Sequence, residues 1–395
     1  MVHAVEPSSP RRFMAIGVAA VLVVSGCVGA TRVSVEAGST SDAETVTTLL
    51  AEVQPAVDVP ACVGELTVEQ KAAEMLMVLV DTPGRAAPLV SQRLVGGYGL
   101  VGDQAAEVAG QVAMVGSVAT FPLLVSSDEE GGTVQRLKAA LGELPAARSV
   151  AESMSVGDAT LLYRNFAAKM KAAGFSMNFA PVLDIGTGAE LGTRTFGNDA
   201  TTVKNYGLAA MQAMTAAGVI PVVKHWPGLG TGGADPHKAA VPLGTFEELR
   251  TNDLVPFEQA IALDAPAIMV SHGSISQSTG GLPASISREA ITELLRGDQR
   301  FDGLVITDSL GMSAVTMHVP ESQAAMMAIS AGADIALVSK PEEVQPAHDA
   351  ITGAISGGLI DAQQVDASVA RVLRAKGVTG ACPALAAPPA GDGGG

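Results

Sequence analysis

The sequence has few aromatic residues and few basic ones. Only 3% of its 395 residues are Phe, Trp or Tyr, and 24 Lys and Arg face 40 Asp and Glu, which leaves a formal net charge of −16 at pH 7. A chain with so few cations cannot replace the condensed counterions along a phosphate backbone, so we expect no binding to nucleic acid. The excess of acidic residues is better explained by solubility than by recognition of a basic partner.

Cysteine is also scarce, with three residues in the whole chain. Cys27 follows Val24-Ser25-Gly26, at the end of an apolar run that begins at Phe13 behind Arg11 and Arg12. The run is short for a membrane span and is typical of a signal peptide. The small residues before Cys27 resemble a bacterial lipobox, which implies cleavage before Cys27 and acylation of its thiol. An ordinary signal peptide with an incidental cysteine is the alternative.

The composition divides the chain into four parts. Residues 1–26 are the expected signal peptide, and residues 27–60, rich in Ser, Thr, Ala, Val and Glu, are interpreted as a flexible tether. Residues 61–382 are expected to form one folded domain, and the Ala-, Pro- and Gly-rich residues 383–395 a disordered tail. This organisation predicts an extracytoplasmic protein that a lipid anchor holds at the bacterial cell membrane.

Within the folded domain, short apolar segments alternate with amphipathic ones. Apolar strands separated by helices favour parallel pairing, because parallel strands are buried on both faces and need crossovers. Eight such units close a barrel, so the predicted fold is α/β, a (β/α)₈ TIM-type barrel. A doubly wound open sheet is the alternative, although no Gly-rich phosphate-binding sequence follows the first strand. The predicted strands are Met75–Val80, Gly97–Val101, Pro122–Ser126, Ser176–Ala180, Ile220–Lys224, Ala267–Ser271, Gly303–Thr307 and Asp334–Val338, and the clearest helical segments are Thr160–Ala173, Val203–Ala217, Arg288–Arg296 and Val365–Lys376.

The two remaining cysteines, Cys62 and Cys382, lie just before the first and just after the last element of this barrel. A closed barrel brings its two ends together, and an exported chain is exposed to an oxidising compartment. We therefore predict a disulfide between them.

Charged side chains follow five of the predicted strands directly. In barrels of this kind, polar residues at the carboxyl ends of strands form the active site. One acid or one histidine there would mean little, but convergence from five strands is hard to produce by chance. The segments are Ser127-Asp128-Glu129-Glu130-Gly131-Gly132 with Val134-Gln135-Arg136, Asp184 with Gly192-Thr193-Arg194, Lys224-His225-Trp226-Pro227-Gly228 with Asp235-Pro236-His237, Ser271-His272, and Thr307-Asp308.

These motifs resemble those of glycoside hydrolase family 3, and within it the short single-domain bacterial β-N-acetylglucosaminidases of the NagZ type. The resemblance extends from about Leu66 to Arg374. It implies a retaining glycoside hydrolase that removes terminal β-linked N-acetylglucosamine, with peptidoglycan fragments as the expected substrate. The implied reaction has two steps and needs neither a metal nor a cofactor.

The resemblance also assigns the catalytic groups. Asp308 is the expected nucleophile, since a carboxylate at a strand end is rigidly held; its alternative role is to cap the next helix. His237 is the expected acid/base, because an imidazole titrates near neutrality, and Asp235 would orient it. An Asp-Pro-His surface turn is the alternative for that pair. Two departures from the family, Leu229 and Pro236, put the geometry of this loop in doubt.

Five residues match the sugar-binding positions of the family. A carboxylate accepts two hydrogen bonds at once, which suits Asp128 to a pair of sugar hydroxyls. For Arg136 a structural salt bridge is the alternative, and Asp184 and His272 receive only supporting roles. The five positions are Asp128, Arg136, Arg194, Lys224 and His225.

Three other functions remain open at this point. A phosphorylase would use the same site, because a neutral histidine acid/base does not repel phosphate as a carboxylate would. A β-glucosidase would share the nucleophile, and a catalytically inactive lipoprotein would bind cell-wall fragments without turning them over. In each case the partners are a carbohydrate and a membrane, and we expect a monomer.

Overall fold

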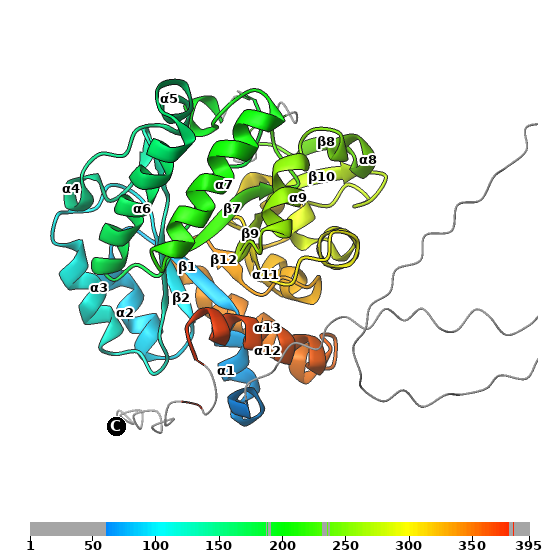
Figure 1. Cartoon of the computed structure of the whole chain (residues 1–395). Helices are drawn as coiled ribbons and strands as arrows, with labels where there is room; N and C mark the ends of the chain where they lie inside the picture. The colour runs from blue at the N-terminus through cyan, green and yellow to red at the C-terminus, as the bar shows by residue number, and fades with distance from the viewer. Residues whose placement is uncertain are drawn as a thin grey trace, which may run out of the picture. The chain divides into compact units, whose positions relative to one another are not determined.

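The computed structural model describes residues 61–186, 188, 191–230, 235, 238–378 and 382 (Figure 1). Cys27, His237, the expected signal peptide and tether, and all of the expected tail lie outside the described residues. Within the described part, no helix is both long enough and apolar enough to cross a membrane.

All eight predicted strands are present, most of them within two residues of the expected ends. They are β1 (Leu76–Val80), β2 (Gly97–Leu100), β3 (Leu124–Ser127), β6 (Met177–Asn178), β7 (Ile220–Trp226), β9 (Ala267–Val270), β11 (Leu304–Thr307) and β12 (Ala336–Val338).

These strands form a closed parallel barrel. Four pair in the order β12-β1-β2-β3 and four in the order β11-β9-β7-β6. At one seam, the Phe179 N–H donates to the Ser127 carbonyl at 3.0 Å and joins β3 to β6; at the other, the Thr307 N–H donates to the Ile335 carbonyl at 3.1 Å and joins β11 to β12. Each strand therefore lies beside its neighbours in chain order. The predicted (β/α)₈ barrel is confirmed, and the open-sheet alternative is wrong.

Helices surround the strands (Figure 1). Several of them begin where a side chain accepts a free backbone N–H, among them α6 after Ser155 and α7 after Asp199. The predicted helix at Arg288–Arg296 forms as the π-helical segment η4 (Glu289–Asp298). The other helices near the barrel are α1 (Val68–Glu74), α2 (Pro83–Ser91), α3 (Val108–Gly116), α6 (Val156–Ala172), α7 (Ala200–Ala216), α9 (Val255–Ala262), α11 (Glu321–Ser330), α12 (Val344–Ser356) and α13 (Ala362–Ala375).

Several short elements lie outside this eightfold pattern, and the sequence did not predict them. The hairpin β4 (Glu129–Gly131) and β5 (Val134–Gln135) follows β3 directly, and β8 (Val241–Thr245) pairs with β10 (Gly273–Ser276). The short helices are α4 (Lys138–Leu141), α5 (Ala147–Ser153), α8 (Phe246–Arg250) and α10 (Ser313–Thr316), with 3₁₀ turns η1 (Ala61–Glu65), η2 (Gly192–Arg194), η3 (Ala284–Ile286) and η5 (Pro341–Glu343).

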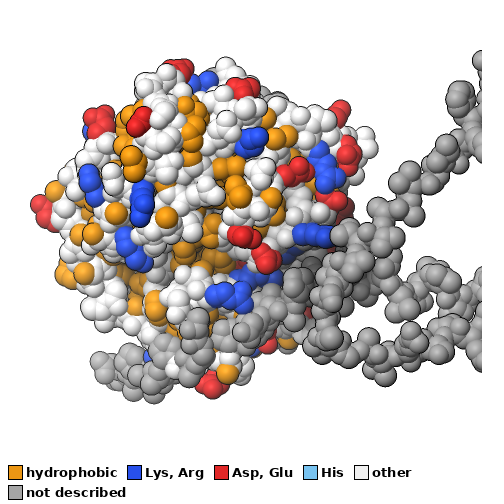
Figure 2. All heavy atoms as spheres, in the orientation of Figure 1, with side chains coloured by type: hydrophobic (Ala, Val, Ile, Leu, Met, Phe, Trp, Pro, Cys, Tyr) orange, Lys and Arg blue, Asp and Glu red, His pale blue; other side chains and the backbone are white. Residues whose placement is uncertain are grey.

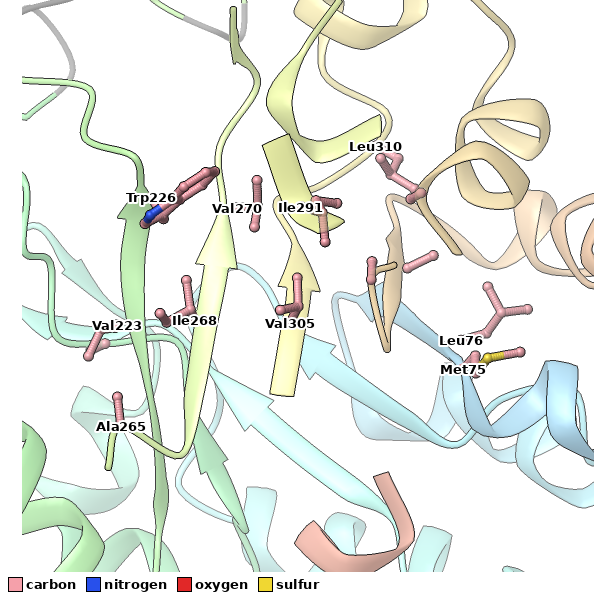
Figure 3. Close-up of a cluster of buried hydrophobic side chains, with 14 of the residues drawn as sticks. Met75, Leu76, Val223, Trp226, Ala265, Ile268, Val270, Ile291, Val305 and Leu310 are labelled. Atoms are coloured by element: carbon pink, nitrogen blue, oxygen red, sulfur yellow. The ribbon is translucent and has the colours of Figure 1, made fainter. Parts of the chain in front are cut away.

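Alternation along the strands divides the core into two clusters. Val223 of β7, Ile268 of β9 and Val305 of β11 belong to the larger cluster, which also contains Ile291 of η4 and other helix residues (Figure 3). Their neighbours along the strands belong to a separate cluster inside the barrel, formed by residues such as Met269. Each strand is thus apolar on both faces, as a parallel barrel requires.

The ends of the domain are joined covalently. Cys62 of η1 and Cys382 form a disulfide across 320 residues, with their Cα atoms 4.6 Å apart. On the face drawn in Figure 2, basic and acidic side chains are interspersed, and no continuous basic surface is visible there.

Candidate active site

A cavity of about 540 Å³ lies at the carboxyl ends of the barrel strands. Its apolar floor includes Phe179, Met269 and Leu337, which also belong to the cluster inside the barrel. Six residues that the sequence assigned to nucleophilic attack or sugar binding line its wall. They are Asp128, Arg136, Arg194, Lys224, His225 and Asp308.

Asp308 follows β11 and is held by the strand itself. Its N–H donates to the Val270 carbonyl of β9 at 2.9 Å, and its Oδ1 accepts the Ser309 N–H at 2.7 Å. The next helix, α10, begins at Ser313 and takes Met312 as its cap residue, so the alternative role of Asp308 as a helix cap is wrong. The side chain lies at the cavity wall with the residue 8% exposed.

The surroundings of Asp308 keep its carboxylate ionised. Burial alone would raise its pKa, but the nearby His272 and His225, the Ser309 N–H and the Lys224 ammonium together lower the pKa below its usual value. A carboxylate that is charged, held in place and open to a cavity is suited to nucleophilic attack.

Four charged side chains form a network beside Asp308. The Lys224 Nζ lies 2.6 Å from Oδ1 of Asp128 and 2.6 Å from Oε1 of Glu130. Arg194 donates to the same Glu130 through two nitrogens, at 2.7 and 2.9 Å. Glu130 therefore fixes two of the predicted sugar-binding cations. The sequence analysis did not assign Glu130 a role, although Glu130 stands between Asp128 and Gly131 in a segment expected at the active site.

Charge pairing outweighs burial for Glu130 and Lys224. Burial would raise the pKa of Glu130, but Lys224 and Arg194 lower that pKa to about 2. Burial would likewise lower the pKa of Lys224, and Asp128 and Glu130 raise it instead. Glu130 and Lys224 therefore stay charged at neutral pH. Lys224 contacts only Oδ1 of Asp128, so among the described residues the other oxygen of Asp128 is available to a ligand.

Two glycines allow the β4–β5 hairpin to pack closely. Gly131 and Gly132 have φ angles of +90° and +60°, which favour glycine. A Cβ at Gly131 would lie 2.1 Å from the Pro145 carbonyl oxygen. This close approach places Asp128 and Arg136 at the two ends of the hairpin, facing one cavity.

Among the described residues, Arg136 has no acidic partner. Its Nε is buried without a hydrogen-bond partner, and no ion pair joins its guanidinium to a carboxylate within the described ranges. The alternative of a structural salt bridge is therefore wrong for the described part of the chain. A cation without a partner that lines a cavity is available for a ligand.

Asp184 and His272 support the site from behind, as the sequence indicated. Asp184 is fully buried; its Oδ2 lies 2.6 Å from Nδ1 of His225, and its Oδ1 accepts the Leu229 N–H at 2.7 Å. His272 lies 2.7 Å from the Ser285 hydroxyl and 2.8 Å from the Ser309 carbonyl oxygen, next to the nucleophile. Leu229 contributes an apolar side chain to the cavity wall.

The expected acid/base pair is only half described. The Asp235 Oδ2 lies 2.8 Å from the Lys238 Nζ, and its carbonyl oxygen accepts the N–H groups of Lys238 and Ala239. His237 lies outside the described residues, so its role and that of Asp235 stay predictions. Among the residues that the structure does describe, no group of three or more His, Cys, Asp and Glu is arranged to hold a metal ion.

Comparison with known proteins gives a consistent family match. Residues 67–375 match the model of the glycosyl hydrolase family 3 N terminal domain. The chain is 35% identical to the beta-hexosaminidase LpqI of Mycobacterium tuberculosis over 387 residues, which cover 94% of this chain and 99% of that protein.

Solved structures agree with the sequence match. A glycosyl hydrolase of the same family from Mycobacterium smegmatis superposes with a TM-score of 0.76 and 33% identity, covering 80% of this chain and 99% of that one. A family 3 beta-N-acetylglucosaminidase from Paenibacillus superposes with a TM-score of 0.75 and 31% identity, covering 83% of this chain and 65% of that one.

Proposed function

The chain belongs to glycosyl hydrolase family 3, and on that basis we propose that its cavity hydrolyses cell-wall glycosides by a two-step retaining mechanism. It is a glycosidase of the β-N-acetylhexosaminidase class that removes terminal N-acetylglucosamine. The observation that carries the mechanism is the convergence of Asp308, Asp128, Lys224 and His225 on one cavity at the carboxyl end of the barrel.

In the first step, Asp308 attacks the anomeric carbon of the sugar. Its lowered pKa keeps it charged, and the Ser309 N–H fixes its orientation. The bond from the anomeric carbon to the leaving oxygen breaks as His237 gives that oxygen a proton. The product of this step is a covalent glycosyl ester on Asp308.

In the second step, water attacks the same carbon and releases the sugar. His237, now neutral, takes a proton from the water, and the Asp308 carboxylate is regenerated. Asp235 would fix the tautomer of His237 and stabilise its cationic form. Two inversions at one carbon leave the configuration of the sugar unchanged.

The charged network would hold the sugar in place during both steps. Asp128 offers its second carboxylate oxygen to a hydroxyl, and Lys224 and His225 offer donors from β7. Arg136 offers a guanidinium that no acidic side chain of the described residues pairs with. Because these groups are already fixed by Glu130 and Asp184, binding costs little further ordering.

We assign peptidoglycan fragments as the substrate class. The lipobox-like sequence before Cys27 supports a position outside the cytoplasmic membrane, where such fragments supply terminal β-linked N-acetylglucosamine. The enzyme would act there as a monomer held by its lipid anchor. Globomycin, which blocks the signal peptidase of lipoproteins, should leave an unprocessed precursor; normal processing in its presence would contradict the anchor.

A chromogenic N-acetylglucosaminide tests the activity. The pure protein should release the chromophore, and the matching glucoside should be a poor substrate; the reverse preference would indicate a β-glucosidase. Phosphate added to the assay separates hydrolysis from phosphorolysis, because only a phosphorylase makes sugar 1-phosphate. Sugar binding without any turnover would indicate an inactive binding protein.

His237→Ala tests the acid/base role. An activated aryl leaving group departs without protonation, whereas a natural sugar leaving group does not. The variant should therefore lose much more activity on an unactivated disaccharide than on the chromogenic substrate. An equal loss on both substrates would contradict a role in protonating the leaving oxygen.

A further inference from the structure

Glu129 stands between the two carboxylates of the network and has no part in the mechanism above. Its residue is fully buried, and it does not line the 540 Å³ cavity. A single oxygen, Oε1, nevertheless accepts the Ser127 hydroxyl at 2.7 Å and the N–H groups of Arg136 and Leu137 at 3.1 Å each.

These hydrogen bonds connect the two ends of the β4–β5 hairpin. Ser127 is the last residue of β3 and directly precedes Asp128, whereas Arg136 directly follows β5. The hairpin itself is short, and its register shifts between Glu129 and Gly131. The carboxyl oxygen of Glu129 therefore closes a hairpin that its own strand pairing holds only weakly.

The same residue attaches the hairpin to the barrel. The side-chain oxygen of Asn178, on β6, accepts the Glu129 N–H at 3.0 Å, and the Asn178 amide donates back to the Glu129 carbonyl at 3.3 Å. The side chain and the backbone of Glu129 thus attach the two ends of the hairpin to β6, a strand of the barrel.

Among the residues that the structure describes, the other carboxyl oxygen has no hydrogen-bond partner. Oε2 of Glu129 and the hydroxyl of Tyr163 are both buried without a hydrogen-bond partner, and both residues line a small cavity of about 10 Å³ beside Glu130 and Arg194. A buried acid with one oxygen that accepts no hydrogen bond destabilises a fold relative to an apolar side chain of similar size. The three hydrogen bonds that Oε1 of Glu129 accepts compensate for this cost, and all three come from residues at the ends of the hairpin.

We propose that Glu129 is a positioning residue for the sugar: it holds Asp128 and Arg136 at a fixed separation and thereby sets the affinity for the substrate. The inference rests on the proposed function, because the affected property is sugar binding. Glu129 contacts neither the nucleophile nor the cavity, so the effect falls on KM more than on kcat.

Three variants test the proposal. Glu129→Met keeps the length of the side chain but removes the acceptor, and Glu129→Gln keeps an acceptor at the same place. Ser127→Ala removes one of the three donors. With a chromogenic N-acetylglucosaminide, we expect KM to rise about tenfold in Glu129→Met, about threefold in Ser127→Ala, and to stay within about threefold of wild type in Glu129→Gln.

Glu74→Gln is the matched control. Glu74 is also a buried carboxyl, paired with Lys376 at the amino end of the strands, far along the chain from the hairpin. This change should lower the melting temperature and leave KM unchanged. It separates a loss of stability from a loss of positioning.

An unchanged KM in Glu129→Met, or an equal rise in Glu129→Met and Glu129→Gln, would overturn the proposal. If Glu129→Met does not fold, Ser127→Ala decides, and an unchanged KM there overturns it as well. Failure of the proposed function would give a different result, because the wild-type protein itself would then show no turnover of the glycoside.

Discussion

Nδ1 of His225 lies 2.6 Å from Oδ2 of Asp184, a carboxylate that is fully buried behind the cavity wall. The second oxygen of Asp184 accepts the Leu229 N–H at 2.7 Å, so the carboxylate itself is held from two sides. The imidazole is therefore fixed in one orientation, with Nε2 as the nitrogen that remains for a ligand.

Asp184→Asn tests this arrangement. The amide preserves the shape of the side chain, but its NH₂ group favours the wrong tautomer of His225. We expect kcat/KM to fall at least tenfold, with kcat and KM measured on the chromogenic substrate and folding checked by circular dichroism. An active Asp184→Asn protein would show that the orientation of His225 does not matter.

Arg136 and Arg194 differ in their partners and should differ when removed. Arg136→Ala removes a cation that forms no ion pair within the described part of the chain. KM should therefore rise about tenfold or more while the free energy of unfolding stays within about 1 kcal/mol. Arg194→Ala removes one of the two cations that pair with the buried Glu130. It should therefore raise KM and also lower the free energy of unfolding by about 2 kcal/mol or more. Urea unfolding measured with both variants compares the two; equal stability losses would contradict the assignment.

The ionisation of Glu129 should make stability depend on pH. Burial raises its pKa from 4.5 to about 7, against the opposing hydrogen bonds from Ser127, Arg136 and Leu137. A raised pKa in the folded state stabilises the fold below pH 4.5, and this contribution is lost as pH rises through 7. Glu129→Gln cannot titrate, so it should gain stability relative to wild type over that range, by about 3 kcal/mol at most.

Urea unfolding of both proteins at pH 4.5 and pH 8 measures the difference. The charged and titratable groups around Glu129 are Asp128, Glu130 and Arg194, with Tyr163 on α6, and all of them are the same in both proteins. A constant difference in the free energy of unfolding between the two pH values would show that Glu129 does not titrate in this range.

The disulfide should stabilise the domain without affecting its chemistry. Cys62 and Cys382 close a loop of 320 residues, and neither cysteine lines the cavity. Cys62→Ser combined with Cys382→Ser should lose about 3 to 5 kcal/mol of stability and keep the KM of the parent. In Cys27→Ala protein, thiol titration without reductant should find no free thiol; two free thiols would contradict the bridge.

The strands could be predicted because each is an apolar run between helices, a pattern set by burial on both faces. The position of Asp308, Asp128 and Lys224 at one end of the barrel could also be predicted, because the carboxyl ends of parallel strands lie together. The π-helical winding of η4 was not predictable, since its residues have an ordinary helical pattern.

The roles of Glu130 and Glu129 could not be read from the sequence. Glu130 pairs with Arg194 and Lys224, which lie at least 64 residues away, and only the closed barrel brings them together. Glu129 differs from its acidic neighbours only in the direction of its side chain, which alternates along β4. The segment after β3 could be predicted to belong to the site, but the separate roles of Glu129 and Glu130 could not.

The most direct test of the account is the identity of the covalent intermediate. A fluorinated N-acetylglucosaminyl analogue that slows the second step should label the protein once, and peptide mass spectrometry should find the sugar on Asp308. Asp308→Ala protein should take up no label and lose at least about a thousandfold in kcat. A label on another residue, or full activity without Asp308, would contradict the central claim.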